Sequence, residues 1–230
     1  MPTREFHSRT SEAMGSQPSP TGDGPKRRDE IRDKALKDLQ RYEVLMLDGH
    51  FDFGNGYHGR VYLNPHQLFR YPSTIWRFAQ DLLDALPASL LERTEVVAGP
   101  VMGGALLAHT VAGLLDSRRD IGRPPTVFVP FGVDAKSGLT ISRFYTQQVE
   151  ARTVLLVDDV RNTGQTFARC AALIRGAGGI LIGTAEIYDR MEAMVDAGVP
   201  NFPLAEYKAP RNYDAKDCPL CRSGVPVTAF

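Results

Sequence analysis

Two adjacent carboxylates followed by a small polar turn are the residues of this chain best suited to chemistry. The apolar run at 154–157 predicts a short buried strand, and Asp158 and Asp159 follow it directly. Ionised carboxylates only accept hydrogen bonds, so they suit a pair of vicinal hydroxyls. The turn then leads into a predicted helix at 167–175, whose amino end favours a phosphate. A diol beside a phosphate describes a ribose 5-phosphate.

The turn itself supplies the candidate phosphate ligands. Successive backbone amides and hydroxyls can surround a phosphate where a strand gives way to a helix. Ligands of open α/β sheets also bind at the carboxyl ends of the strands. The residues assigned to substrate binding here are Val160, Arg161, Asn162, Thr163, Gly164, Gln165 and Thr166.

A second loop, at 99–104, lies between a predicted strand and a predicted helix. Its paired glycines let a diphosphate approach the backbone closely. Gly-Gly turns are common, so this loop gains meaning only from the motif that follows it. Met102, Gly103 and Gly104 are assigned to substrate binding.

Alternating elements must position these loops. Strands that alternate with helices predict an α/β fold with a largely parallel sheet covered on both faces. The expected strands are 96–98, 126–129, 154–157 and 180–187, and the expected helices are 29–44, 75–86, 105–115 and 167–175. Ser73 is the expected N-cap of the second helix and Trp76 a packing residue within it. Residues 49–63 predict a hairpin or loop, and 130–150 a long connection without periodicity.

Composition divides the chain into two parts. Residues 1–27 are polar and predict a disordered tail, and residues 28–230 form one domain. The formal net charge is zero, which argues against a nucleic-acid or membrane surface. The chain has neither a secretory leader pattern nor a long apolar span, so we expect a cytoplasmic protein.

The motif at 158–166 resembles the binding motif for 5-phosphoribosyl 1-diphosphate (PRPP) in type I phosphoribosyltransferases, with Asn162 in place of the first threonine. The 99–104 loop is similar to the pyrophosphate loop of the orotate phosphoribosyltransferase family. Further matches to that family, in its order, are Gly49-His50-Phe51, Asn55-Gly56-Tyr57-His58, Tyr62, Asp189-Arg190 and the tail at 218–226.

The resemblance implies a type I phosphoribosyltransferase fold, a parallel sheet flanked by helices with a small hood formed by N- and C-terminal segments. It also implies transfer of the phosphoribosyl group from PRPP to a pyrimidine nucleobase, orotate, with Mg2+ and in a homodimer. Arg190 would read the orotate carboxylate. A mobile loop at 134–144 would add Lys136 and Arg143 to the catalytic carboxylates Asp158 and Asp159.

One departure keeps alternatives open. The Arg-containing segment that the family usually has after the equivalent of the second strand reads Pro130-Phe131-Gly132-Val133 here. Lys136 and Arg143 could equally be solvated loop charges. The alternatives are therefore a phosphoribosyltransferase for another base, or a non-catalytic PRPP-binding regulator of the same fold.

The cysteines and histidines are given structural interpretations. Cys218 and Cys221 have the spacing of zinc ligands, but a second cysteine pair is absent from the sequence, so no metal site is assigned. His50 and His58 could line the base pocket or simply hold the hairpin. His109 is expected to be a core or surface histidine.

Overall fold

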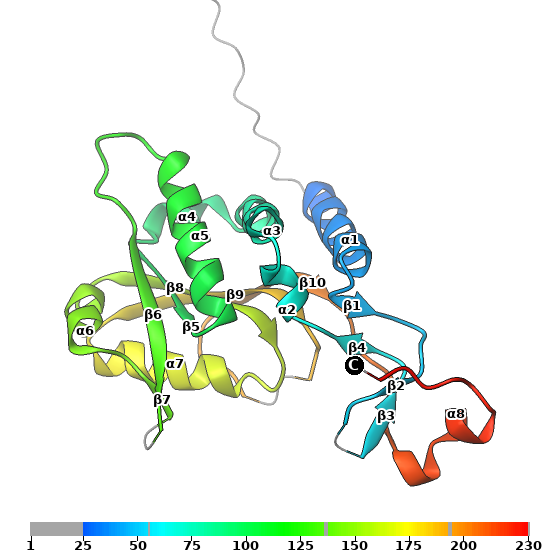
Figure 1. The fold of residues 1–230 in the computed structure, drawn as a ribbon. Helices are drawn as coiled ribbons and strands as arrows, with labels where there is room; N and C mark the ends of the chain where they lie inside the picture. Colours follow the sequence, from blue (N-terminus) through cyan, green and yellow to red (C-terminus); the bar gives the residue numbers. More distant parts are fainter. Residues whose placement is uncertain (1–24, 55, 136–137, 193–194, 230) are drawn as a thin grey trace, which may run out of the picture.

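A six-stranded sheet forms the centre of the protein (Figure 1). The structure, a computed structural model, describes residues 25–54, 56–135, 138–192 and 195–229. The strand order is β10-β9-β8-β5-β6-β7, and every neighbouring pair is parallel except β6 and β7. The predicted parallel α/β sheet is thus confirmed. The strands are β5 (Val96–Pro100), β6 (Val127–Asp134), β7 (Gly138–Thr140), β8 (Thr153–Arg161), β9 (Ile180–Asp189) and β10 (Asn201–Glu206).

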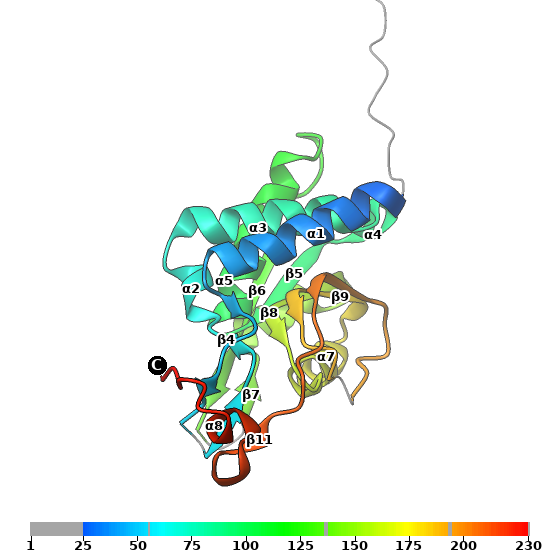
Figure 2. The same cartoon turned by 90° about the vertical axis from the view of Figure 1, so that its right-hand side faces the viewer.

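Helices cover both faces of this sheet (Figure 2). In β8, Leu155 and Val157 belong to a core with α1, α3 and α5, whereas Val154 and Leu156 face a core with α6 and α7. Because alternate residues of a strand point to opposite faces, a strand covered twice must be apolar throughout. The helices are α1 (Pro25–Arg41), α2 (His66–Phe69), α3 (Pro72–Ala85), α4 (Ala88–Arg93), α5 (Gly103–Ser117), α6 (Arg143–Val149) and α7 (Gln165–Gly176).

Short strands from the two ends of the domain build the predicted hood. Strand β3 pairs antiparallel with β2 and with β11, which lies far along the chain. Phe51 of β2 also bridges to Thr228, so the last residues close over the hairpin. The hood elements are β1 (Leu45–Met46), β2 (Phe51–Asp52), β3 (Tyr57–Gly59), β4 (Tyr62–Leu63), β11 (Tyr213–Asp214), the 3-10 turn Ala215–Asp217 and α8 (Pro219–Arg222). No helix within the described ranges is long and apolar enough to cross a bilayer.

Two helix starts differ from the predictions because proline suits the first turn of a helix. Helix α1 begins at Pro25, within the range 1–27 for which a tail was predicted, and residues 1–24 lie outside the described residues. Tyr71, not Ser73, is the N-cap of α3, with Pro72 in its first turn. Trp76 is 47% exposed, so the prediction that it packs in the core was wrong.

The segment at 130–150 is not the unstructured connection that was predicted. Strand β6 runs on to Asp134 and pairs with β7, and α6 follows. Leu139 and Ile141 pack against the core under α7, which gives the hairpin an apolar anchor. Lys136, a predicted catalytic residue, lies outside the described residues.

A buried carboxyl group lies in the centre of the sheet. Glu186 of β9 is fully buried and is the register partner of Asp158 in β8. Its Oε1 accepts a hydrogen bond from Asn201 Nδ2 at 2.8 Å. Burial raises the pKa of Glu186 from 4.5 to about 8, because the charged form is poorly solvated there. Glu186 is therefore largely protonated at neutral pH.

This carboxyl should make the protein less stable as pH rises. Between pH 4.5 and 8 the folded state holds a proton that the unfolded chain releases, so the free energy of unfolding falls with increasing pH. Glu186→Gln removes this pH dependence, which amounts to a change in the free energy of unfolding of at most about 1.4 kcal/mol per pH unit. Urea denaturation from pH 5 to 9 should show a flatter profile for this variant, while the exposed Glu92→Gln keeps the wild-type profile. Parallel profiles for Glu186→Gln and wild type would contradict the assignment.

Candidate active site

Three adjoining cavities lie along the carboxyl ends of the parallel strands. The first, of about 170 Å3, lies at the start of α7. The second, of about 570 Å3, lies between the Gly103 loop and β7 and shares Asp158 and Thr166 with the first. The third, of about 480 Å3, lies under the hood and shares Asp159 with the second. The two carboxylates therefore stand where the cavities meet.

The first cavity has the form of an anion site. Its described lining includes every residue from Val160 to Thr166. This segment runs from the end of β8 through the connecting turn to the start of α7. Gly164 precedes α7 with a φ of 83°, and a Cβ there would lie 2.3 Å from the Val195 carbonyl oxygen. Only glycine fits both constraints. The free amides at the start of the 12-residue helix α7 then carry the partial positive charge that attracts a phosphate.

Backbone hydrogen bonds hold the two carboxylates in place. Asp158 Oδ1 accepts from the Asp159 amide at 2.9 Å, and Asp159 Oδ1 accepts from the Val160 amide at 3.0 Å. Asp158 is only 7% exposed, and burial, with the nearby charge of Asp159, raises its pKa well above the usual range. Asp159 is the less buried of the two carboxylates.

The glycine loop approaches this pair so closely that side chains are excluded. A Cβ on Gly103 would lie 2.4 Å from Asp159 Oδ2, and one on Gly104 would lie 2.7 Å from Asp158 Oδ1. Met102 is 75% exposed and lines the second cavity, and the Val101–Met102 peptide is cis. The loop thus presents backbone to any ligand that binds beside the carboxylates.

Aromatic side chains from the hood form a wall of the third cavity. The rings of Phe53 and Tyr62 lie nearly parallel, with centroids 6.3 Å apart and planes 19° apart. Arg190 lines the same cavity, and its Nη2 lies 3.4 Å from Glu192 Oε1. A planar ring bound here would meet aromatic surface and a guanidinium.

Two basic residues predicted to act in the site have these positions in the structure. Arg161 Nη1 pairs with Asp189 Oδ2 at 3.1 Å, with both side chains largely buried, so its guanidinium braces β8 against β9. Substrate binding was predicted for Arg161, which lines the first cavity, and this role stays a prediction. Arg143 begins α6 and is not among the described residues that line the three cavities.

Sequence reasoning missed one cation. Arg169 lines both the first and the second cavity from the first turns of α7. It follows Thr166 by three residues, and residues three apart share a helix face. That spacing was the available signal. Arg169 supplies positive charge next to the carboxylate pair.

Comparisons with known proteins agree with this geometry. No protein-family model matches the chain. An orotate phosphoribosyltransferase of Caldanaerobacter subterraneus subsp. tengcongensis is 31% identical over 85% of this chain and 95% of its own length. An orotate phosphoribosyltransferase of Thermotoga maritima is 30% identical over 84% of this chain and 95% of its own length.

Solved structures show the same fold. The orotate phosphoribosyltransferase of Aeropyrum pernix superposes with a TM-score of 0.57 at 22% identity, covering 75% of this chain and 93% of that one. The adenine phosphoribosyltransferase of Trypanosoma brucei gives a TM-score of 0.54 at 16% identity, covering 81% of each chain. The fold is that of the type I phosphoribosyltransferases, and the extended similarity in sequence shows that the chain belongs to the orotate phosphoribosyltransferase family.

Proposed function

We propose that the protein transfers the phosphoribosyl group of PRPP to orotate and releases diphosphate. The observation that carries this is that an anion site, an aromatic pocket and two carboxylates adjoin one another at the end of β8. That set of neighbours matches a ribose 5-phosphate joined to a base. Membership of the orotate phosphoribosyltransferase family supports the same reaction.

The reaction requires little covalent chemistry from the protein. A ring nitrogen of the base attacks C1 of the ribose, and the bond from C1 to the diphosphate oxygen breaks with its electron pair leaving on the diphosphate. The transition state carries positive charge on the sugar, so the protein mainly aligns the reactants and stabilises charge. The amides before α7 hold the 5-phosphate, Asp158 and Asp159 hold the ribose hydroxyls, and the backbone of the Gly103 loop faces the diphosphate.

The proposal includes a Mg2+ ion that binds together with PRPP. The carboxylates of Asp158 and Asp159 are the hard oxygen donors that Mg2+ accepts, and two such donors leave most coordination positions to PRPP oxygens and water. When bound, the ion neutralises charge on the departing diphosphate.

A homodimer is also proposed, because the family resemblance implies one. Arg143 is not among the described residues that line the cavities of its own chain, which fits a role at a partner's site. Light scattering of the purified protein should give the mass of a dimer, and a monomer with full activity would reject this part of the proposal.

A diphosphate-release assay with PRPP, Mg2+ and a panel of bases tests the function. Release with orotate at a far higher rate than with adenine or uracil is the expected result. Release only with another base would change the acceptor. PRPP binding without release for any base would instead indicate a regulator of the same fold.

Replacing both carboxylates should weaken PRPP binding without unfolding the protein. Loss of charge-assisted hydrogen bonds costs about 1.5–3 kcal/mol, so in Asp158→Asn/Asp159→Asn the Kd for PRPP should rise about 10- to 100-fold. The amides keep the side-chain volume, and Asp120→Asn on the exposed 118–125 connection is the matched control. Calorimetry that finds an unchanged Kd in the double variant would reject the ribose-binding role.

Arg169 should act through its charge. Removing this cation between the first two cavities in Arg169→Ala should raise the KM for PRPP several-fold, whereas Arg169→Lys should retain most of the affinity. Steady-state kinetics at two salt concentrations measure this. If the Ala and Lys variants bind PRPP equally well, the charge of residue 169 has no part in binding.

Arg190 should distinguish orotate from bases that lack a carboxylate. A guanidinium suits a carboxylate because it offers parallel donors, so Arg190→Ala should lower kcat/KM for orotate at least about tenfold. The small residual activity with uracil should change little. Arg93→Ala, at the exposed end of α4, is the control. An equal loss for both bases would mean that Arg190 pairs with Glu192 and does not read the substrate.

A further inference from the structure

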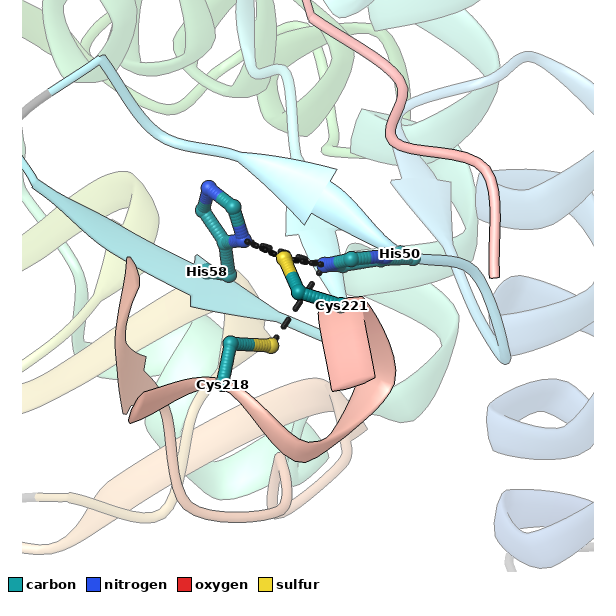
Figure 3. Close-up of side chains that lie close together, drawn as sticks. All are labelled: His50, His58, Cys218 and Cys221. Carbon is teal, nitrogen blue, oxygen red and sulfur yellow. Dashed lines mark hydrogen bonds between the residues drawn. The ribbon is translucent and has the colours of Figure 1, made fainter. Parts of the chain in front are cut away.

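Two histidines of the hood and two cysteines of the tail converge on one point (Figure 3). His50 lies just before β2 and His58 lies within β3, while Cys218 and Cys221 flank the start of α8. Their ligand atoms all lie within 4.8 Å of one another. We call these four residues the hood cluster. The cluster is separate from the three cavities, and none of its members is in their described linings.

The spacing of these atoms is that of a coordination tetrahedron. His50 Nε2 and His58 Nδ1 are 3.0 Å apart, and three of the nitrogen–sulfur separations are 3.3, 3.5 and 3.7 Å. Zinc with bonds of about 2.05 Å to nitrogen and about 2.3 Å to sulfur would separate nitrogens by about 3.3 Å and nitrogen from sulfur by about 3.6 Å. The four side chains therefore already stand close to ligand positions.

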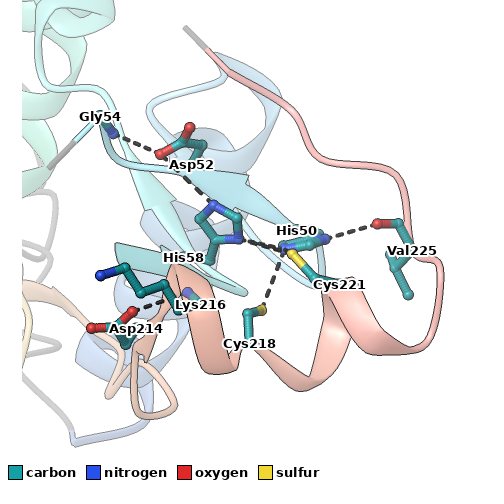
Figure 4. A network of polar contacts seen from close by, with 9 residues as sticks. All are labelled: His50, Asp52, Gly54, His58, Asp214, Lys216, Cys218, Cys221 and Val225. Atoms are coloured by element: carbon teal, nitrogen blue, oxygen red, sulfur yellow. Dashed lines mark hydrogen bonds and ion pairs between the residues drawn. The ribbon is translucent and has the colours of Figure 1, made fainter. Parts of the chain in front are cut away.

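The outer nitrogen of each histidine ring faces an oxygen acceptor (Figure 4). His50 Nδ1 lies 2.9 Å from the Val225 carbonyl oxygen, which only accepts, so this nitrogen carries the hydrogen. His58 Nε2 faces Asp52 Oδ1 at 3.9 Å. With a hydrogen on its Nδ1, His50 directs the lone pair of Nε2 into the cluster, where His58 Nδ1 lies 3.0 Å away. An oxygen acceptor behind the ring is usual for metal-bound histidines.

The local backbone presents the ligands without strain. Strands β2 and β3 form a hairpin that places both histidines on one side, and β11 pairs with β3 to bring the tail alongside. Cys218 is the N-cap of α8, and the Arg222 amide donates to its carbonyl oxygen. The turn that follows brings Cys221 back over the rings. The cluster thus joins segments more than 160 residues apart in sequence.

We propose that the hood cluster binds a structural Zn2+ ion. Two thiolates and two imidazoles in a tetrahedron are a ligand set typical of zinc, and four protein ligands leave no open position for a substrate. His50, His58 and Cys218 are buried, and Cys221 is exposed, so a chelator can reach the ion from that side. This assignment reverses the expectation that the Cys218 and Cys221 pair lacks metal partners.

The ion would fix the hood over the aromatic pocket. Phe53, Tyr62 and Asn212 all line the third cavity. Phe53 lies between β2 and β3, Tyr62 lies in β4, and Asn212 immediately precedes β11. Zinc joins these two segments next to that wall. The proposal therefore predicts that loss of zinc raises the KM for the base more than the KM for PRPP, because the first two cavities are built from the sheet and α7.

Metal analysis of the full-length protein tests the proposal. Protein made in zinc-supplemented medium and dialysed against metal-free buffer should hold one zinc per chain. Cys221→Ser, which changes an exposed side chain, should hold less than a tenth of that amount, while Cys170→Ala and His109→Gln, matched controls outside the cluster, should keep all of it. Removal of zinc by a chelator should lower Tm, and added Zn2+ should restore it.

Two further measurements keep the proposal falsifiable if Cys221→Ser does not fold. Wild-type protein reconstituted with Co2+ should show the visible absorption of tetrahedral cobalt with thiolate charge-transfer bands. Asp52→Asn keeps all four ligands but removes the carboxylate behind His58, so it should bind zinc about 10- to 100-fold more weakly. Metal-free wild-type protein, octahedral cobalt, or a Cys218–Cys221 disulfide in freshly isolated protein would each overturn the proposal.

Discussion

The close approach of the 99–104 loop to the end of β8 is the constraint on which the site depends. At Gly103 and Gly104 there is no space for a Cβ, because the carboxylates of Asp159 and Asp158 occupy it. A side chain at either position would push the loop away and separate the first and second cavities. Backbone amides and carboxylates can therefore face one ligand from opposite sides only because both residues are glycines.

Buried acidic groups set the electrostatics behind that contact. Asp158 and Glu186 are register partners on neighbouring strands, and burial raises the pKa of both. Asp189 lies at the end of β9 and is neutralised by Arg161. The sheet thus tolerates several acids because one is paired and burial favours the neutral form of the other two, and Asp159 is the more accessible acid of the pair that ends β8.

The hood and the sheet contribute different parts of the proposed reaction. The sheet and α7 supply the anion site and the carboxylates, which any PRPP-dependent transfer would require. The hood supplies Phe53 and Tyr62, which form part of the pocket for the base. Since the hood strands are only two or three residues long, their pairing adds few hydrogen bonds. A metal that joins the hairpin to the tail would give this small unit the rigidity that a base pocket needs.

Sequence alone determined the parallel sheet, the two ligand loops and the family, because each depends on local pattern. Val154 to Val157 had to be a buried strand, and the turn before α7 had to expose its amides. The helix starts at Pro25 and Pro72 were misjudged by a few residues, since proline and serine both favour that region. The 130–150 segment was missed because its apolar residues pack only after β6 and β7 have paired.

Only the tertiary structure decided which charged and metal-ligating side chains work together. Arg161 lines the first cavity, and its guanidinium is held there by an aspartate that is 28 residues away in sequence. Arg169 reaches two cavities because α7 begins where β8 ends. The hood cluster is the clearest case, since Cys218 and Cys221 find their partners in His50 and His58 at the other end of the chain. A pairing across that distance leaves no periodic signal, because strand pairing and tail closure bring the ligands together.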